Sequence, residues 1–278
     1  MLRHFLNPPN WFTSASMFCG MYSILLATGV AHGEPNFYRA AWMIVFGGVF
    51  DMLDGRVARI TGTSSEFGIQ LDSLADVVSF GIAPAVLLYA WGLQELGWLG
   101  LAVAFFFFLC GTFRLARFNL GADGTKHAWS EGLTITMAGG IAASLVMAHA
   151  ANDLGPVQHP VAIAALVCFL AILMISRLRF FSWSALRLRP THMVPVALGL
   201  AVVLVVSLRF RWASAFLAIG ALYVMAALVD NFIAILRREP GPHTEDPLGL
   251  GVQEMLDEVF DEDTGEYARA DLPRERRR

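Results

Sequence analysis

The chain of 278 residues carries a formal net charge of −3, and 56% of it is hydrophobic while only 15% is charged. This balance predicts an all-α integral membrane protein and argues against a water-soluble globular domain. No basic, aromatic-rich surface points to nucleic acid.

The apolar residues fall into runs of about 20, the length needed to cross a bilayer core of about 30 Å. Residues 1–9 have no cleavable signal pattern and predict a short interfacial segment before the first span. The three cysteines lie inside apolar runs and are interpreted as packing residues. Eight transmembrane helices are predicted in a membrane domain of residues 1–236, at 11–31, 38–60, 67–91, 97–118, 132–151, 158–177, 193–208 and 213–236.

Eight spans would place both termini on the same side of the membrane, and the basic residues decide which side that is. Positive charge favours the cytoplasm, so the termini and the acidic stretch described below are predicted to face it, in a bacterial-type inner or plasma membrane. The basic residues on this side are Arg3, Arg56, Arg59, Arg114, Arg117, Lys126, Arg177, Arg179, Arg187, Arg189, Arg237 and Arg238.

The composition changes near Glu239 to proline, glycine and charge. Segments of low hydrophobicity and dense charge do not bury enough apolar surface to fold. Residues 237–278 are therefore predicted to form a largely disordered cytoplasmic tail, and the arginines at 274–278 are expected to contact anionic lipid headgroups.

Four aspartates interrupt the apolar chain: Asp51, Asp54, Asp72 and Asp76. The first two are three residues apart and the last two are four apart, so each pair falls on one face of a helix. Ionisable groups in membrane segments are costly and usually mark a functional cavity. Two such helices facing each other would gather four carboxylates. Their oxygens are suitable ligands for Mg²⁺ or Mn²⁺, which would neutralise their charge.

The residues between these pairs suit a phosphate ligand. Gly55 lets a ligand approach the backbone, and Arg56 and Arg59 bring guanidinium groups whose geometry matches phosphate. Ser65 is placed to cap the helix that follows it.

The pattern D-x2-D-G-x2-A-R-x8-G-x3-D-x3-D resembles the signature of the CDP-alcohol phosphatidyltransferase family. The stretches 65–84 and 113–119 resemble the phosphatidylserine synthase branch of that family, and the likeness extends over about residues 1–235. The fixed positions of the signature are Asp51, Asp54, Gly55, Ala58, Arg59, Gly68, Asp72 and Asp76.

The resemblance implies transfer of a phosphatidyl group from CDP-diacylglycerol to L-serine, giving phosphatidylserine and CMP. It implies two Mg²⁺ or Mn²⁺ ions, with Asp51 and Asp72 bridging both, Asp54 binding one and Asp76 the other. Asp76 would also be the catalytic base. Residues implied to bind CDP-diacylglycerol are Gly55, Arg59, Ser65, Asn10 and Thr13, and a homodimer in membrane lipid is implied as well.

Arg114 and Arg117 are three residues apart and support two interpretations. They are either positive anchors at the membrane surface or a clamp that binds the carboxylate of serine. The sequence departs from the resemblance just after them, where Gly-Leu-Pro-x-Pro is expected and Gly132-Leu133-Thr134-Ile135-Thr136 is found.

Other functions stay open at this point. A sister transferase could use glycerol-3-phosphate or inositol phosphate as acceptor. An ion or proton transporter could use the carboxylates as a pathway, and a non-enzymatic scaffold is the remaining class. CMP release from CDP-diacylglycerol would discriminate against the last two.

Overall fold

The computed structural model describes residues 8–62, 65–120, 129–181 and 213–236, together with a short strand pair at 260–261 and 266–267. The chain divides into two compact units, residues 1–231 and 232–278. The predicted membrane domain of residues 1–236 and tail of 237–278 remain predictions, and the interfacial segment predicted at residues 1–9 lies largely outside the described residues.

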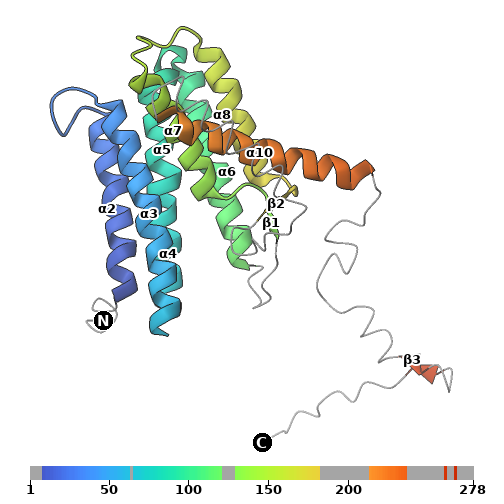
Figure 1. The fold of residues 1–278 in the computed structure, drawn as a ribbon. Helices are drawn as coiled ribbons and strands as arrows, with labels where there is room; N and C mark the ends of the chain where they lie inside the picture. The colour runs from blue at the N-terminus through green and yellow to red at the C-terminus, as the bar shows by residue number, and fades with distance from the viewer. Residues whose placement is uncertain are drawn as a thin grey trace, which may run out of the picture. The chain divides into compact units, whose positions relative to one another are not determined.

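Unit one is built from helices, which confirms the predicted helical class (Figure 1). The helical elements are α2 (Pro8–Ala27), α3 (Phe37–Thr61), α4 (Glu66–Asp76), η1 (Val77–Ile82), α5 (Ala83–Leu88), η2 (Tyr89–Leu93), η3 (Gln94–Leu96), α6 (Trp98–Leu120), α7 (Ile135–Ala151), α8 (Pro160–Ile175) and α10 (Ala213–Leu236). The first six predicted spans and the eighth coincide with these helices. The seventh, 193–208, lies outside the described residues.

Among the described residues, three helical segments are long and apolar enough to cross a membrane: Glu66–Leu96, Trp98–Leu120 and Ala213–Ala234. Two shorter helices, α7 and α8, are also apolar. The helix α3 has 25 residues, but it carries Asp51, Asp54, Arg56 and Arg59 in its second half. The length and hydropathy of the helices therefore support an integral membrane protein, while the count of eight spans stays a prediction.

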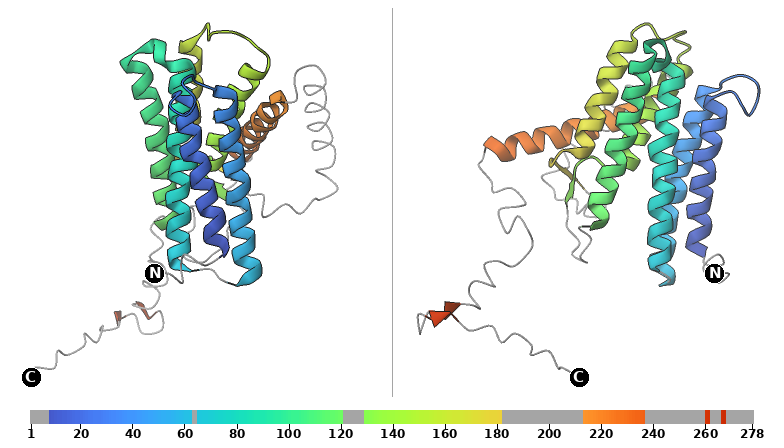
Figure 2. Two further views of the ribbon diagram at one scale, coloured as in Figure 1. Left: turned by 90° about the vertical axis from the view of Figure 1, so that its left-hand side faces the viewer. Right: turned by 180° about the vertical axis from the view of Figure 1, so that it is seen from behind.

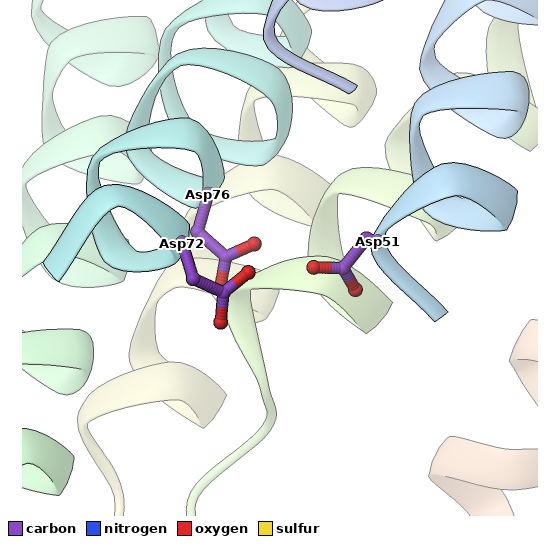
Figure 3. Close-up of side chains that lie close together, drawn as sticks. All are labelled: Asp51, Asp72 and Asp76. Carbon is purple, nitrogen blue, oxygen red and sulfur yellow. The ribbon is translucent and has the colours of Figure 1, made fainter. Parts of the chain in front are cut away.

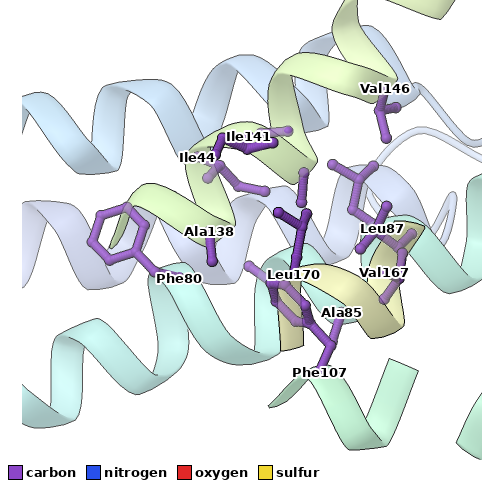
Figure 4. Packing of buried hydrophobic residues seen from close by; sticks show 14 of the residues in the cluster. Ile44, Phe80, Ala85, Leu87, Phe107, Ala138, Ile141, Val146, Val167 and Leu170 are labelled. Carbon is purple, nitrogen blue, oxygen red and sulfur yellow. The ribbon is translucent and has the colours of Figure 1, made fainter. Parts of the chain in front are cut away.

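The helices α2, α3 and the segment 66–96 run side by side in every view (Figures 1 and 2). The helix α3 also packs on α7, and α6 packs on α8. The apolar core between them contains Ile44, Phe80, Leu87, Phe107 and Leu170, all at most 3% exposed (Figure 4). Small residues bring α2 and α3 close together, and the Ser23 hydroxyl donates to the Ala40 carbonyl at 2.8 Å.

The helical segment 66–96 changes its winding directly after the last aspartate. Residues Val77–Ile82 form a π-helix, and Pro84 follows in the first turn of α5. Pro84 has no N–H to donate, and the change of helix type falls where an α-helix would need that bond. The π-helix is held against α2, because the Ser79 hydroxyl donates to the Ser16 carbonyl at 2.9 Å and a Cβ at Gly20 would lie 2.7 Å from Ser79 Cα.

Two short strands lie next to helices in the chain, one before α7 and one after α8. The strands β1 (Trp129–Glu131) and β2 (Arg179–Phe181) pair antiparallel, a small departure from the all-α prediction. The side-chain amide of Asn231 extends this pairing, accepting from the Arg179 N–H at 2.9 Å and donating to the Arg179 carbonyl at 2.8 Å. This use of Asn231 as a strand partner was not predicted.

The segment between β1 and α7 lies directly against the end of α8. Gly132 has φ +71°, its N–H donates to the Leu178 carbonyl at 2.9 Å, and the Leu133 N–H donates to the Leu173 carbonyl at 3.0 Å. Where proline was expected, Thr134 accepts a bond from the Met137 N–H at 3.3 Å and caps α7. A threonine cap therefore begins this helix in place of a proline.

Unit two contains the strands β3 (Phe260–Asp261) and β4 (Glu266–Tyr267), which pair antiparallel with Phe260 opposite Tyr267. Most of residues 237–278 lies outside the described part of the chain. Disorder of this tail therefore remains a prediction.

Candidate active site

Three of the four predicted aspartates meet between two helices. Asp51 comes from α3, and Asp72 and Asp76 come from successive turns of α4 and point toward it (Figure 3). Each offers one carboxylate oxygen, and these oxygens all lie within 4.8 Å of one another. We call these three residues the acidic trio. The predicted pairing of two helical faces is confirmed for them.

Two oxygens of the acidic trio are buried without a compensating partner among the described residues. One oxygen each of Asp72 and Asp76 is buried, and neither has a hydrogen-bond partner among the described residues. Buried carboxylates that repel one another and lack donors are costly unless a proton or a metal ion neutralises them. Oxygen-only donors at this spacing suit a hard divalent ion such as Mg²⁺ or Mn²⁺, so the residues present fit the predicted metal site.

Asp54 lies in the same helix as Asp51 but is held separately. It is 6% exposed, and its Oδ2 accepts a bond from the Thr13 hydroxyl of α2 at 2.8 Å. Asp54 thus bonds to α2, and its charge acts on Asp72 of the acidic trio.

A cleft of about 200 Å³ opens beside these carboxylates. All five residues that the resemblance assigned to CDP-diacylglycerol line it, together with two of the aspartates. The lining residues are Pro9, Asn10, Thr13, Asp54, Gly55, Ala58, Arg59, Ser65, Gly68, Ile69 and Asp72. The cleft thus joins the N-terminal ends of α2 and α4 to the C-terminal half of α3.

The backbone geometry of the cleft explains two of its residues. Ser65 accepts a bond from the Gly68 N–H at 3.1 Å and begins α4, which confirms the predicted cap. A Cβ at Gly68 would lie 3.2 Å from Ser65 Oγ and 3.4 Å from Asn10 Oδ1. Glycine at 68 thus lets α2 and α4 approach closely beneath the cleft.

Gly55 differs from Gly68, because a Cβ there would meet no atom within 4 Å. Packing gives no reason for glycine at this helical position, where it costs about 1 kcal/mol relative to alanine. The Arg59 side chain reaches back to the Gly55 carbonyl at 2.9 Å. Gly55 therefore keeps space open in the cleft rather than between helices.

The two predicted clamp arginines point to different surroundings. The Arg117 guanidinium donates to the backbone carbonyls of Ile175 at 2.9 Å and of Glu131 and Ser176 at 3.3 Å. It satisfies carbonyls at the end of α8, where helix geometry leaves them without partners. Arg114 is 7% exposed, its guanidinium carbon lies 5.2 Å from the centroid of the Phe118 ring, and its electrostatic neighbours are Arg117, Asp76 and Tyr223. Arg114 is thus buried within the electrostatic reach of Asp76, whereas Arg117 joins α6, α8 and β1.

Two side chains near the site were not predicted. Tyr223 lies in α10 and packs on Phe180 with ring centroids 5.9 Å apart. Asn119 donates to the Ser73 hydroxyl of α4 at 3.0 Å, beside Asp72. A single tyrosine in an apolar run gives no signal on its own, whereas Asn119 stands in the stretch 113–119 that already carried the branch resemblance.

These features define the class of protein. The chain belongs to the CDP-alcohol phosphatidyltransferase family, whose model matches residues 6–171. This family generally uses divalent metals, in agreement with the chemistry of the acidic trio.

More specific relatives share one name, CDP-diacylglycerol–serine O-phosphatidyltransferase. The protein of that name from Helicobacter pylori (strain ATCC 700392 / 26695) is 35% identical over 179 residues, which cover 63% of this chain and 73% of the relative. The Bacillus subtilis (strain 168) protein is 31% identical over 62% of this chain and 88% of its own length. The Saccharomyces cerevisiae protein is 44% identical over 43% of each chain, so less than half of that relative is matched.

Proposed function

We propose that this chain transfers the phosphatidyl group of CDP-diacylglycerol to L-serine, giving phosphatidylserine and CMP. The observation that carries the proposal is the acidic trio beside a cleft lined by Asn10, Thr13, Gly55, Arg59 and Ser65. The shared name of the bacterial and yeast relatives supports serine as the acceptor.

Divalent metal ions, two Mg²⁺ or Mn²⁺, would offset the charge that develops on the pyrophosphate as CMP leaves. Asp51, Asp72 and Asp76 would hold them, with Asp54 completing the ligand set. Arg59 and Ser65 bind the CDP portion at the cleft wall, and the open space at Gly55 admits its phosphates. Asn10 and Thr13 lie at the N-terminal end of α2 and close the same cleft.

The transfer needs a proton acceptor next to the attacking oxygen. The serine hydroxyl attacks the lipid-side phosphorus in line, the bond from that phosphorus to the CMP oxygen breaks, and the hydroxyl proton passes to Asp76. The resemblance assigns this role to Asp76, one of whose buried oxygens has no hydrogen-bond partner among the described residues. No covalent enzyme intermediate is required.

Arg114 is the residue that we assign to the carboxylate of serine. Its buried guanidinium lies in the electrostatic field of Asp76, the base that must meet the serine hydroxyl of the same substrate. A guanidinium presents donors in the geometry that a carboxylate accepts. Arg117, occupied by three carbonyls, holds the surrounding backbone instead.

The membrane setting fits a substrate with acyl chains in lipid and a charged head outside it. We place the site and both termini on the cytoplasmic side, on the distribution of arginine and lysine. Eight spans, a homodimer and a disordered tail belong to the same proposal, resting on the sequence and on the family resemblance.

The proposal is tested by CMP release from CDP-diacylglycerol with Mg²⁺ or Mn²⁺ and a panel of acceptors. Release with L-serine and not with glycerol-3-phosphate or inositol phosphate is the expected result. Release only with a phosphate-bearing acceptor would assign the chain to a sister activity. If the folded protein releases no CMP with any acceptor, the transferase proposal is contradicted and the transporter alternative is favoured.

Gly55→Ala is expected to lower CMP release by about 10²-fold without lowering thermal stability. The added methyl group meets no protein atom but enters the space assigned to the phosphates, and small misplacements of a substrate have effects of this size. Gly140→Ala in α7 is the matched control, because a Cβ there also meets nothing within 4 Å. Equal activity of the two variants would show that Gly55 has no role in binding.

Arg114→Gln is expected to raise the KM for serine about 10- to 100-fold, the range for loss of a charged hydrogen bond, with little change in the KM for CDP-diacylglycerol. Arg117→Gln is expected to lower stability and leave the serine KM near the wild-type value. Arg114→Lys, which keeps the charge and loses the fork, should give an intermediate KM. An equal rise in both KM values for Arg114→Gln would contradict the assignment.

A further inference from the structure

Thr13 makes an unusual bond for a helical hydroxyl. Hydroxyl groups inside helices commonly donate to the carbonyl four residues earlier, and Ser14, Thr28, Thr61 and Thr112 all do so at 2.7–2.9 Å. Thr13 lies 3.2 Å from its equivalent acceptor, the Pro9 carbonyl, and only 2.8 Å from Asp54 Oδ2. Its hydroxyl is therefore directed out of its own helix toward α3.

A hydroxyl has one proton to donate, so its two acceptors compete for it. The carboxylate is the stronger acceptor because it is charged, and it is also the nearer one. The contact is well protected from water, since Thr13 is 3% exposed and Asp54 is 6% exposed. With Oδ2 held by Thr13 and a further hydrogen bond from the Gly55 backbone, the orientation of the Asp54 carboxylate is set.

We infer that Thr13 is a positioning residue for the divalent cation site and acts through Asp54. The inference rests on the proposed function for the nature of the ligand. Asp54 bonds to α2 and acts electrostatically on Asp72, and the bond from Thr13 fixes the orientation of the carboxylate that would complete the ligand set. Hydrogen bonds that orient metal ligands commonly contribute 10- to 100-fold to affinity. Thr13 thus lines the cleft without being required to contact the nucleotide.

The experiment is a titration with Mn²⁺ of the full chain in detergent, followed by the electron paramagnetic resonance signal of the free ion, with and without CDP. Thr13→Val keeps the shape and removes the donor, and we expect it to raise the Kd for Mn²⁺ about 10- to 100-fold. Thr13→Ser keeps the donor and should stay within a few-fold of wild type. Thr112→Val is the matched control, because its hydroxyl bonds only within α6.

Asp54→Asn separates action through Asp54 from a direct role. If Thr13 acts through Asp54, adding Thr13→Val to Asp54→Asn should change the Mn²⁺ affinity no further. An additional loss in the double variant would overturn the inference. So would wild-type Mn²⁺ affinity in Thr13→Val, or a wild-type chain that binds no Mn²⁺ in either condition.

A replacement variant and one further outcome complete the test. If Thr13→Val does not fold, Thr13→Ala, which also removes the donor, takes its place in the same titration. If the wild-type chain binds Mn²⁺ with the expected dependence on Thr13 but releases no CMP, the proposed function fails while the role of Thr13 stands.

Discussion

Asp76→Asn is expected to reduce CMP release by about 10³-fold, within the 10²–10⁴ range for loss of a general base. The asparagine amide keeps the shape of the side chain but neither accepts the serine proton nor supplies a charged oxygen ligand. The measurement is CMP release with saturating CDP-diacylglycerol, L-serine and Mn²⁺. Glu95→Gln, an exposed position in η3 outside the site, is the control and should retain full activity.

Asp76→Asn lowers activity but should not lower the stability of the metal-free protein. Asp76 lies beside Asp51 and Asp72, so removing its charge relieves repulsion in the metal-free protein. Its thermal midpoint without metal should be equal to or higher than that of wild type, and the stabilisation produced by added Mn²⁺ should shrink. Activity close to wild type in Asp76→Asn would exclude Asp76 as the base.

Gly132→Ala is expected to destabilise the fold by about 3–5 kcal/mol, combining a left-handed backbone with a clash in a packed region. Gly132 has φ +71°, and its Cβ would overlap the Met174 carbonyl oxygen and lie 2.9 Å from that of Ser176. These are backbone atoms at the end of α8, so they do not move aside as a flexible side chain would. Thermal or denaturant unfolding in detergent measures the effect.

Gly155 offers a closely matched control for this effect. Its φ is +72°, yet a Cβ there meets nothing within 4 Å. Gly155→Ala should therefore show only the conformational cost, about 1–2 kcal/mol. Similar losses in the two variants would mean that α8 yields to the new methyl group and that the close contact at Gly132 is not rigid.

The helices were predictable because each depends on a local property, a run of apolar residues long enough for a span. The winding of 77–82 was not, since a π-helix depends on how Ser79 and Gly20 meet across two helices. Pro84, which removes one helical N–H, does not by itself specify a π-helix over 77–82. The pairing of β1 with β2 likewise depends on distant segments and on the amide of Asn231.

The acidic trio could be predicted because helical spacing fixes which side chains share a face. The position of Asp54 could not, since the spacing of three residues from Asp51 holds equally well when its partner is Thr13 of another helix. The same limit explains the arginines. Arg114 and Arg117 share a face by spacing, but the carbonyls that Arg117 meets are left open by the end of α8, which the local sequence does not reveal.

Because Val77–Ile82 form a π-helix, the number of residues in this segment sets the direction in which Asp72 and Asp76 point. A π-turn takes in one residue more than an α-turn for each hydrogen bond that it closes, and one residue corresponds to about 100° around a helix axis. Losing a residue there would rotate Asp72 and Asp76 away from Asp51 while Phe80 and Leu87 kept their apolar neighbours. The π-helix therefore fixes the rotation of one half of the span relative to the other. One half packs in the apolar core, and the other half directs Asp72 and Asp76 toward Asp51.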